Sequence, residues 1–244
     1  MNTRIFWLSI IAVISSFIGG FLLANALNRG EINTLKTENG RLKNGQSSAN
    51  RADAELSLSS EEIRQKIAEA DQNPNNFAFQ KNLGIALYNY ASMKQDAELF
   101  GEISRILNRV FENNPKDTDV VVTLGNINFD IGYLKKNNEK FQKAREFYQK
   151  ALEQKPNDAN IRTDLGLTYF LTNPPETDKA IAEFQKSLSI DSKHEKTLQV
   201  LTQALLSQNK DAEAEKYLAR LKEVNPNNQI LPELTAQLNQ KNNL

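Results

Sequence analysis

The side chains that most often carry catalysis or bind metals are scarce in this chain. Its 244 residues include no cysteine and one histidine, His194. Thiolate metal sites, disulfides and histidine-paired metal sites within one chain are therefore excluded. A Ser-His-Asp arrangement needs only one histidine, but His194 follows Asp191, Ser192 and Lys193 between two helical patterns. We expect His194 to be a solvated turn residue rather than a catalytic base.

Acidic pairs, glycines and charge balance give no stronger indication of an enzyme. Glu61 and Glu62 are adjacent carboxylates at the start of a helical pattern, where the helix dipole alone accounts for them. The ten glycines form neither a dinucleotide-binding nor a Walker pattern. Basic and acidic residues number 30 each, so no surface for nucleic acid is indicated. We expect no enzyme, cofactor, metal or nucleic-acid partner, and a hydrolase that uses acidic pairs is the alternative.

A Leu-Gly pair recurs at a constant interval and organises the rest of the chain. The pairs begin at Leu83, Leu124 and Leu165, each 41 residues after the last. Apolar residues at helical spacing follow each pair, and a turn or proline ends the unit, as at Pro115 and Pro156. A fixed period of this size indicates helical hairpins that stack side by side, because one hairpin cannot bury its apolar face alone.

These units resemble the tetratricopeptide repeat (TPR), a helix pair with Leu-Gly and Tyr in the first helix, then Ala, an aromatic residue and a closing Pro. One unit carries Leu165-Gly166 and Tyr169, followed by Ala180 and Phe184. The resemblance implies an all-α fold, a TPR α-solenoid of about four helix hairpins plus flanking helices. It also implies that the protein binds other proteins.

The repeats are longer than those of the family. The family period is about 34 residues, and the excess of about seven is close to two helical turns. We therefore expect residues 89–95 and 132–140 to be extended helices and turns, not loops. In the third unit, Thr172-Asn173-Pro174-Pro175 predicts a rigid break. The glycine of each Leu-Gly pair is expected to let the second helix approach the first closely.

The helical domain is predicted to span residues 59–244. Ser59 to Glu62 form a capping box, so a leading helix is expected over 60–72. Asn-Pro or Lys-Pro turns then separate the units. The predicted elements after the leading helix are repeats 77–117, 118–158, 159–194 and 195–228, and a capping helix over 229–241.

In a TPR stack the first helices line a concave groove, and their outward face gives the candidate protein-binding residues. Tyr88, Phe129 and Phe170 recur at the 41-residue step, so we expect an aromatic ladder; the alternative is that the long helices bury these rings. Flanking Asn and Gln side chains can bind a peptide backbone. Lys81 alone fits a carboxylate-binding clamp, so capture of a chaperone tail is not predicted. The candidate groove residues are Lys81, Tyr88, Asn89, Asn126, Phe129, Asp130, Thr163, Phe170, Gln199 and Gln203.

An uncharged, mostly apolar stretch, residues 5–27, precedes this domain. At about 1.5 Å per residue it can cross a hydrocarbon core of about 30 Å, so it predicts a single transmembrane anchor. Ala24-Asn25-Ala26 resembles a cleavage site, and a cleaved signal peptide is the alternative. Both interpretations favour a periplasmic or extracytoplasmic TPR domain. The positive-inside count favours the opposite side, because Arg4 precedes the stretch and four basic residues follow it within 29–43.

Two patterns near the anchor predict a homo-oligomer. Small residues recur at every fourth position from Ala12 to Ala24, which suits close helix packing, although small residues are common in membrane helices. Residues 28–43 carry a short heptad pattern with Asn39 at an a position, which predicts a helical stalk. Residues 44–58 are small, polar and aperiodic, as expected for a flexible linker.

These features lead to two functional hypotheses. The first is a membrane-anchored TPR scaffold or adaptor that binds a protein or peptide partner in its concave groove. The second rests on layout, because the order of anchor, linker and repeats resembles the TPR subunits of bacterial cytochrome c maturation. That resemblance implies a component that holds apocytochrome.

Overall fold

The computed structural model describes residues 59–242, which form ten α-helices and no strand. The predicted anchor, stalk and linker, residues 5–58, lie outside the described residues. Among the helices that are described, none has the length and apolar character needed to cross a membrane.

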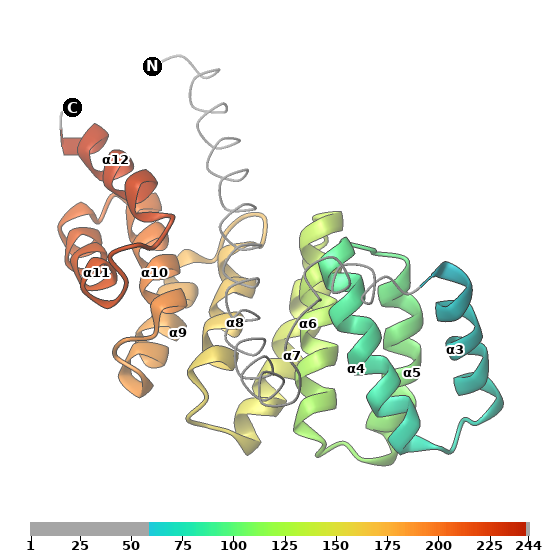
Figure 1. Ribbon diagram of the computed structural model, residues 1–244. Helices are drawn as coiled ribbons and strands as arrows, with labels where there is room; N and C mark the ends of the chain where they lie inside the picture. The colour runs from blue at the N-terminus through green and yellow to red at the C-terminus, as the bar shows by residue number, and fades with distance from the viewer. Residues whose placement is uncertain (1–58, 243–244) are drawn as a thin grey trace, which may run out of the picture. The chain divides into compact units, whose positions relative to one another are not determined.

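The helices follow one another as a stack of antiparallel hairpins, from α3 at one end to α12 at the other (Figure 1). This is the all-α solenoid that the repeats predict. The helices are α3 (Ser60–Gln72), α4 (Phe77–Lys94), α5 (Leu99–Asn113), α6 (Thr118–Lys135), α7 (Asn138–Gln154), α8 (Ala159–Phe170), α9 (Thr177–Ile190), α10 (Glu195–Ser207), α11 (Asp211–Val224) and α12 (Leu231–Asn242).

The first helices of the repeats lie on the inner side of the stack. Contacts between alternate helices join α4 to α6, α8 to α10 and α10 to α12. The second helices show no comparable contacts within the described part. The stack therefore curves toward the first helices, which puts α4, α6, α8 and α10 on the concave side.

Each Leu-Gly pair marks a point where two helices touch. A Cβ added at Gly84 would lie 2.4 Å from Leu107 Cδ2, and one at Gly166 would lie 2.5 Å from Phe184 Cε1. At Gly125 the nearest atom is Tyr148 Cε1, at 2.8 Å. The structure thus confirms that the glycines of the Leu-Gly pairs let the second helix of each repeat approach the first closely, since none of these contacts leaves room for a methyl group.

The turns between repeats also start the next helix. The side chains of Asn76, Asp117 and Asp158, spaced at the 41-residue step, accept hydrogen bonds from the third residue of α4, α6 and α8. The leading helix α3 begins with the predicted capping box. Ser59 Oγ accepts from the Glu62 backbone N–H at 3.2 Å, and Glu62 Oε2 accepts from the Ser59 backbone N–H at 2.8 Å. Polar caps thus fix the helix starts at a regular spacing.

The extra length of the first two repeats is helical, as expected. Helices α4 and α6 continue to Lys94 and Lys135. They end at Gln95 and Lys136, whose left-handed backbone (φ 55° and 49°) closes each helix. In the third repeat α8 stops earlier, at Phe170, before the predicted break at the two prolines.

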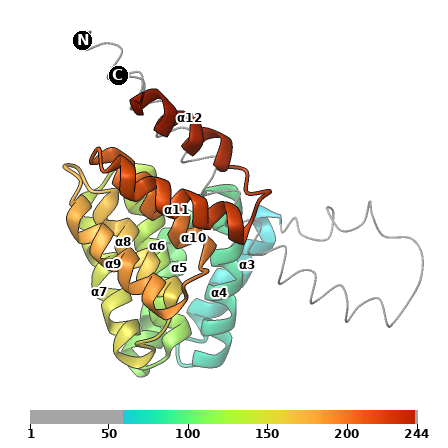
Figure 2. The same ribbon diagram turned by 90° about the vertical axis from the view of Figure 1, so that its left-hand side faces the viewer.

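A polar-faced helix covers the C-terminal end of the stack (Figure 2). Helix α12 begins at Leu231, two residues later than predicted, because Asn228 accepts from the Ile230 backbone N–H at 2.9 Å in a turn of its own. Leu234 and Leu238 are buried, and α12 packs on α10 and α11. It has the composition expected of a capping helix, with an apolar inner and a polar outer face.

Candidate protein-binding groove

The structure places all ten candidate groove residues on the first helices α4, α6, α8 and α10, but they differ in accessibility. Asn89 is exposed, and Lys81, Tyr88, Asn126, Asp130 and Phe170 are half-buried. The other four, Phe129, Thr163, Gln199 and Gln203, are buried.

Lys81 forms a tie between the first two repeats. Its Nζ lies 2.8 Å from both carboxylate oxygens of Asp117 and 3.0 Å from Asp119 Oδ2. Burial opposes the charge, but the hydrogen bonds that the ammonium donates to the two carboxylates outweigh it and raise the pKa of Lys81. Lys196 of α10 makes the same kind of tie, with Nζ 2.6 Å from Asp164 of α8. These two ammonium groups stabilise the inner surface.

The three aromatic rings do not form a continuous exposed ladder. Phe129 is only 4% exposed, and its ring packs edge-on against Phe141 with 5.6 Å between centroids. Phe141 belongs to the first turn of α7, directly after the added segment 132–140, so the start of α7 buries this ring. Tyr88 of α4 is fixed against α6, because its hydroxyl donates to Asp130 Oδ2 at 3.1 Å. Phe170 remains half-buried at the end of α8.

Thr163 belongs to a buried polar cluster between α8, α9 and α10. Its Oγ1 lies 2.6 Å from Thr197 Oγ1 and 2.9 Å from Ser187 Oγ. His194 joins this cluster, with Nδ1 2.5 Å from Thr197 Oγ1 and Nε2 2.9 Å from Asn160 Oδ1. Because Asn160 Oδ1 is an acceptor, Nε2 carries the proton and Nδ1 accepts from Thr197. His194 thus lies at the predicted turn, but it is half-buried rather than solvated, since both ring nitrogens are hydrogen-bonded to neighbouring helices.

The stability of this cluster should depend on pH. Burial, followed by the charge of Lys196, lowers the pKa of His194 below its usual 6.5. A lowered histidine pKa means that the unfolded chain binds the proton more tightly. Stability is then present above about pH 6.5 and is lost as the pH falls through and below that value. We expect the thermal midpoint to fall between pH 7.5 and 5.5, and the fall to be smaller in His194→Gln.

The carboxylates provide the control for this prediction, because they titrate at lower pH. Hydrogen bonds from Arg105 and Arg109 hold the pKa of Asp71 at about 2, below its usual 3.8. Such a group loses its stabilising contribution only as the pH falls below about 4. A His194→Gln variant with the same loss of stability between pH 7.5 and 5.5 as the parent would show that His194 does not cause it.

Asn126 is the accessible polar side chain that the structure orients most firmly. The Tyr148 hydroxyl, from α7, donates to Asn126 Oδ1 at 2.9 Å. Tyr148 is fully buried, so its position is set by the core. The Asn126 amide N–H groups have no partner within the described residues, and the side chain is half-buried on α6. Sequence reasoning found Asn126 but missed Tyr148, which the pattern presents only as a core aromatic.

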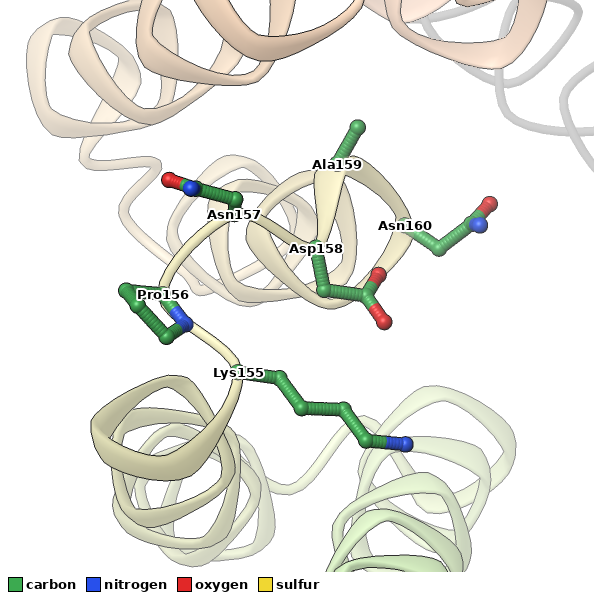
Figure 3. Close-up of a pocket in the computed structure, with 6 residues that line it drawn as sticks. All are labelled: Lys155, Pro156, Asn157, Asp158, Ala159 and Asn160. Carbon is green, nitrogen blue, oxygen red and sulfur yellow. The ribbon is translucent and has the colours of Figure 1, made fainter.

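A shallow pocket lies away from this surface, at the turn between α7 and α8 (Figure 3). Its lining is Lys155 to Asn160. The Asp158 carboxylate accepts from the Ile161 backbone N–H at 3.1 Å and is thus used as a helix cap. In the part of the chain described, no cluster of three histidine or acidic residues could hold a metal ion. The pocket therefore offers no convergent chemistry.

Comparisons with known proteins agree with this architecture. Sequence models of the tetratricopeptide repeat match residues 125–158 and 176–238. No curated protein matches the sequence significantly. A crystal structure of MamA has 24% identity and a TM-score of 0.54, over 67% of this chain and 86% of MamA. MamA from Desulfovibrio magneticus RS-1 has 20% identity and a TM-score of 0.54, over 67% and 84%. Another MamA crystal structure has 23% identity and a TM-score of 0.55, over 80% and 92%.

The structural likenesses are all below 25% identity in these three cases, so they show a shared fold. The sequence matches add the repeat type, and the one over residues 125–158 includes the close contact of Gly125 with Tyr148. This chain therefore carries tetratricopeptide repeats over residues 125–158 and 176–238.

Proposed function

We propose that this protein is a non-enzymatic scaffold that binds a polypeptide on the concave face of α4, α6, α8 and α10. The observation that carries the proposal is the Asn126 amide, which Tyr148 holds through its oxygen while its N–H groups stay on the accessible face of α6. A fixed amide donor can bind a peptide carbonyl without losing further side-chain freedom. Asn89 on α4 is exposed and Phe170 on α8 is half-buried, and they would add polar and aromatic contact.

The proposal predicts that partner capture depends on the Asn126 amide. Asn126→Ala removes one peptide hydrogen bond, so we expect capture to weaken about five- to ten-fold. Tyr148→Phe keeps the Asn126 side chain but removes the hydrogen bond that orients it, so we expect a smaller loss of capture. Capture is measured by photocrosslinking in cells from a photoreactive residue at position 89.

The matched control places the same photoreactive residue at Glu153, an exposed position on the second helix α7. The groove proposal fails if position 153 gives the same adducts as position 89. It also fails if Asn126→Ala leaves the adducts unchanged while the fold, checked by circular dichroism, is retained.

The proposal includes a membrane location, in which residues 5–27 span the bilayer once and the repeat domain is extracytoplasmic. Support comes from the apolar composition of this stretch. Because the chain has no cysteine, a single Asn157→Cys variant can be labelled with a membrane-impermeant maleimide. Labelling in intact cells supports the extracytoplasmic side, and labelling only after lysis would contradict it.

Two finer points remain part of the proposal. The layout shared with TPR subunits of cytochrome c maturation makes an apocytochrome a candidate partner, and adducts from position 89 that contain one would favour it. The anchor and stalk, residues 5–43, would provide self-association, and crosslinking in membranes that yields only monomer would remove this part.

A further inference from the structure

Two exposed apolar side chains occupy the same place in consecutive repeats. Among the described residues, the exposed large apolar side chains are Met93 and Leu134, with 52% and 37% of their surface accessible. They are 41 residues apart, each is the penultimate residue of its first helix, and a lysine follows each, Lys94 or Lys135. A single exposed apolar residue needs no explanation. A pair repeated on two contacting helices, α4 and α6, forms a row at one edge of the stack.

This edge is formed by the added length of the repeats. Met93 and Leu134 lie in the segments that extend α4 and α6 beyond the usual repeat. Around the turn after α6, Lys135 ends α6, Lys136 lies in the turn and Lys140 lies in the first turn of α7, against one acidic residue, Glu139. This turn is therefore both apolar and basic.

The turn after α4 is less basic, because it holds Asp96 and Glu98 beside Lys94. The Asp96 carboxylate is turned to the backbone, where it accepts from the N–H groups of Glu98 and Leu99 at 3.1 and 3.0 Å. Lys94 itself is exposed at the end of α4. The positive charge of the edge is therefore centred on the turn after α6.

The opposite edge of the stack differs in kind. Four of its turns consist of asparagine, aspartate, lysine and proline, at residues 73–76, 114–117, 155–158 and 225–228. The turn at residues 191–194 is Asp-Ser-Lys-His, so none of the five carries a large apolar side chain. In Figure 1 the C-terminal end of α6 lies at the top of the stack, and the turns that lead into α4, α6 and α8 lie at the bottom. Only one edge thus presents apolar side chains together with lysines.

We infer that the Met93–Leu134 edge docks on an anionic lipid surface. Apolar tips enter the interfacial region of a bilayer while neighbouring lysines meet anionic headgroups. Two side chains are too few for a stable protein–protein interface, which buries about 1,200 Å² or more. Two side chains are enough for a weak contact with the bilayer when a tether already holds the domain close to it.

The inference rests on the proposed anchor, because the tether supplies the proximity. Residues 28–58 connect residues 5–27 to the domain, and even fully extended they reach about 110 Å at most. An anchored domain therefore stays at high effective concentration near the headgroups. The docked edge would leave the inner face of the first helices open to a polypeptide.

The test uses the full chain in phosphatidylcholine vesicles with and without phosphatidylglycerol. Since the chain has no cysteine, a spin label attached to Met93→Cys or Leu134→Cys reports one site. Asn157→Cys, on the opposite edge, is the control. We expect labels at 93 and 134 to collide with oxygen, which concentrates in lipid, and to be shielded from a water-soluble nickel chelate. This should occur with phosphatidylglycerol present, and the label at 157 should stay open to nickel.

A charge-reversed variant tests the role of the lysines. Lys135→Glu/Lys136→Glu should reduce the shielding at position 134 about ten-fold or more, since each lysine near an anionic surface contributes to attraction. Both side chains are exposed, so the fold should be retained. The thermal unfolding midpoint should fall only slightly, because carboxylates are unfavourable at the C-terminal end of α6. Unchanged shielding in this variant would overturn the electrostatic part of the inference.

The outcomes separate docking from anchoring. Carbonate-resistant flotation with the vesicles tests the anchor. Flotation with labels 93 and 134 open to nickel overturns docking alone, and mutual dipolar broadening of labels at 134 overturns it in favour of a second copy of the chain. Shielded labels on a protein that carbonate extracts would support docking and contradict the anchor. Loss of both properties overturns both.

Discussion

Replacing Gly166 with alanine should destabilise the repeat domain by about 1–3 kcal/mol. The added methyl group would lie 2.5 Å from Phe184 Cε1 and 3.3 Å from the Ala180 backbone oxygen. Phe184 is fully buried, so its ring cannot swing into solvent, and the backbone oxygen cannot move without shifting α9. The cost of this overlap exceeds the gain of about 1 kcal/mol that alanine normally brings to a helix interior.

Gly101 offers the matched control within the same chain. It lies in α5, is exposed, and a Cβ there would meet nothing within 4 Å. Gly101→Ala should therefore stabilise the domain by about 0.5–1 kcal/mol. Urea unfolding of both variants measures the difference, and Phe184→Leu should relieve part of the penalty at position 166. Equal effects of the two alanine substitutions would show that Gly166 does not mark a close helix contact.

Truncating Leu234 to alanine should cost about 2–4 kcal/mol, because its side chain is fully buried between α12 and the end of the stack. In a solenoid each element contacts only its neighbours, so damage at the end is expected to unfold locally first. Hydrogen exchange should therefore rise in α12 and α11 well before it rises in α6.

Gln240→Ala provides the comparison at an exposed position of the same helix. The Gln240 side chain is accessible to solvent, so we expect the free energy of unfolding to change by no more than about 0.5 kcal/mol. A uniform rise of exchange across α4 to α12 in Leu234→Ala would mean that the domain unfolds as one unit and that α12 is no separate cap.

The features that the sequence predicted well are those set by contacts between residues close in the chain. The Leu-Gly spacing, the capping box at Ser59 and the lengthened helices depend on a hairpin and its turns, so they can be read from periodicity. The first helices, which were predicted to line the groove, do make the contacts between alternate helices. The end of α8 could not be predicted to the residue. A proline pair sets the last position that a helix can reach, but the helix can end before it.

Residues whose role depends on a third helix could not be assigned from the sequence. Thr163 sits at a position that helical projection puts on the groove, yet α9 and α10 both supply hydroxyl groups that enclose it. Phe129 is covered by Phe141, which the start of α7 brings into reach. His194 looked solvated because its neighbours in the chain are polar, while its hydrogen-bond partners come from α8 and α10.

Asp117 couples the unfolding of two adjacent repeats. Its carboxylate starts α6 by accepting from the Val120 backbone N–H at 3.3 Å, and it also receives the Lys81 ammonium from the preceding repeat. If the first turn of α6 unfolds, Lys81 of α4 therefore loses its carboxylate partner. Unfolding of one repeat thus weakens the preceding repeat through a polar contact, without any change in the apolar core. A polar residue of this kind makes adjoining hairpins cooperative even though each one touches only those beside it.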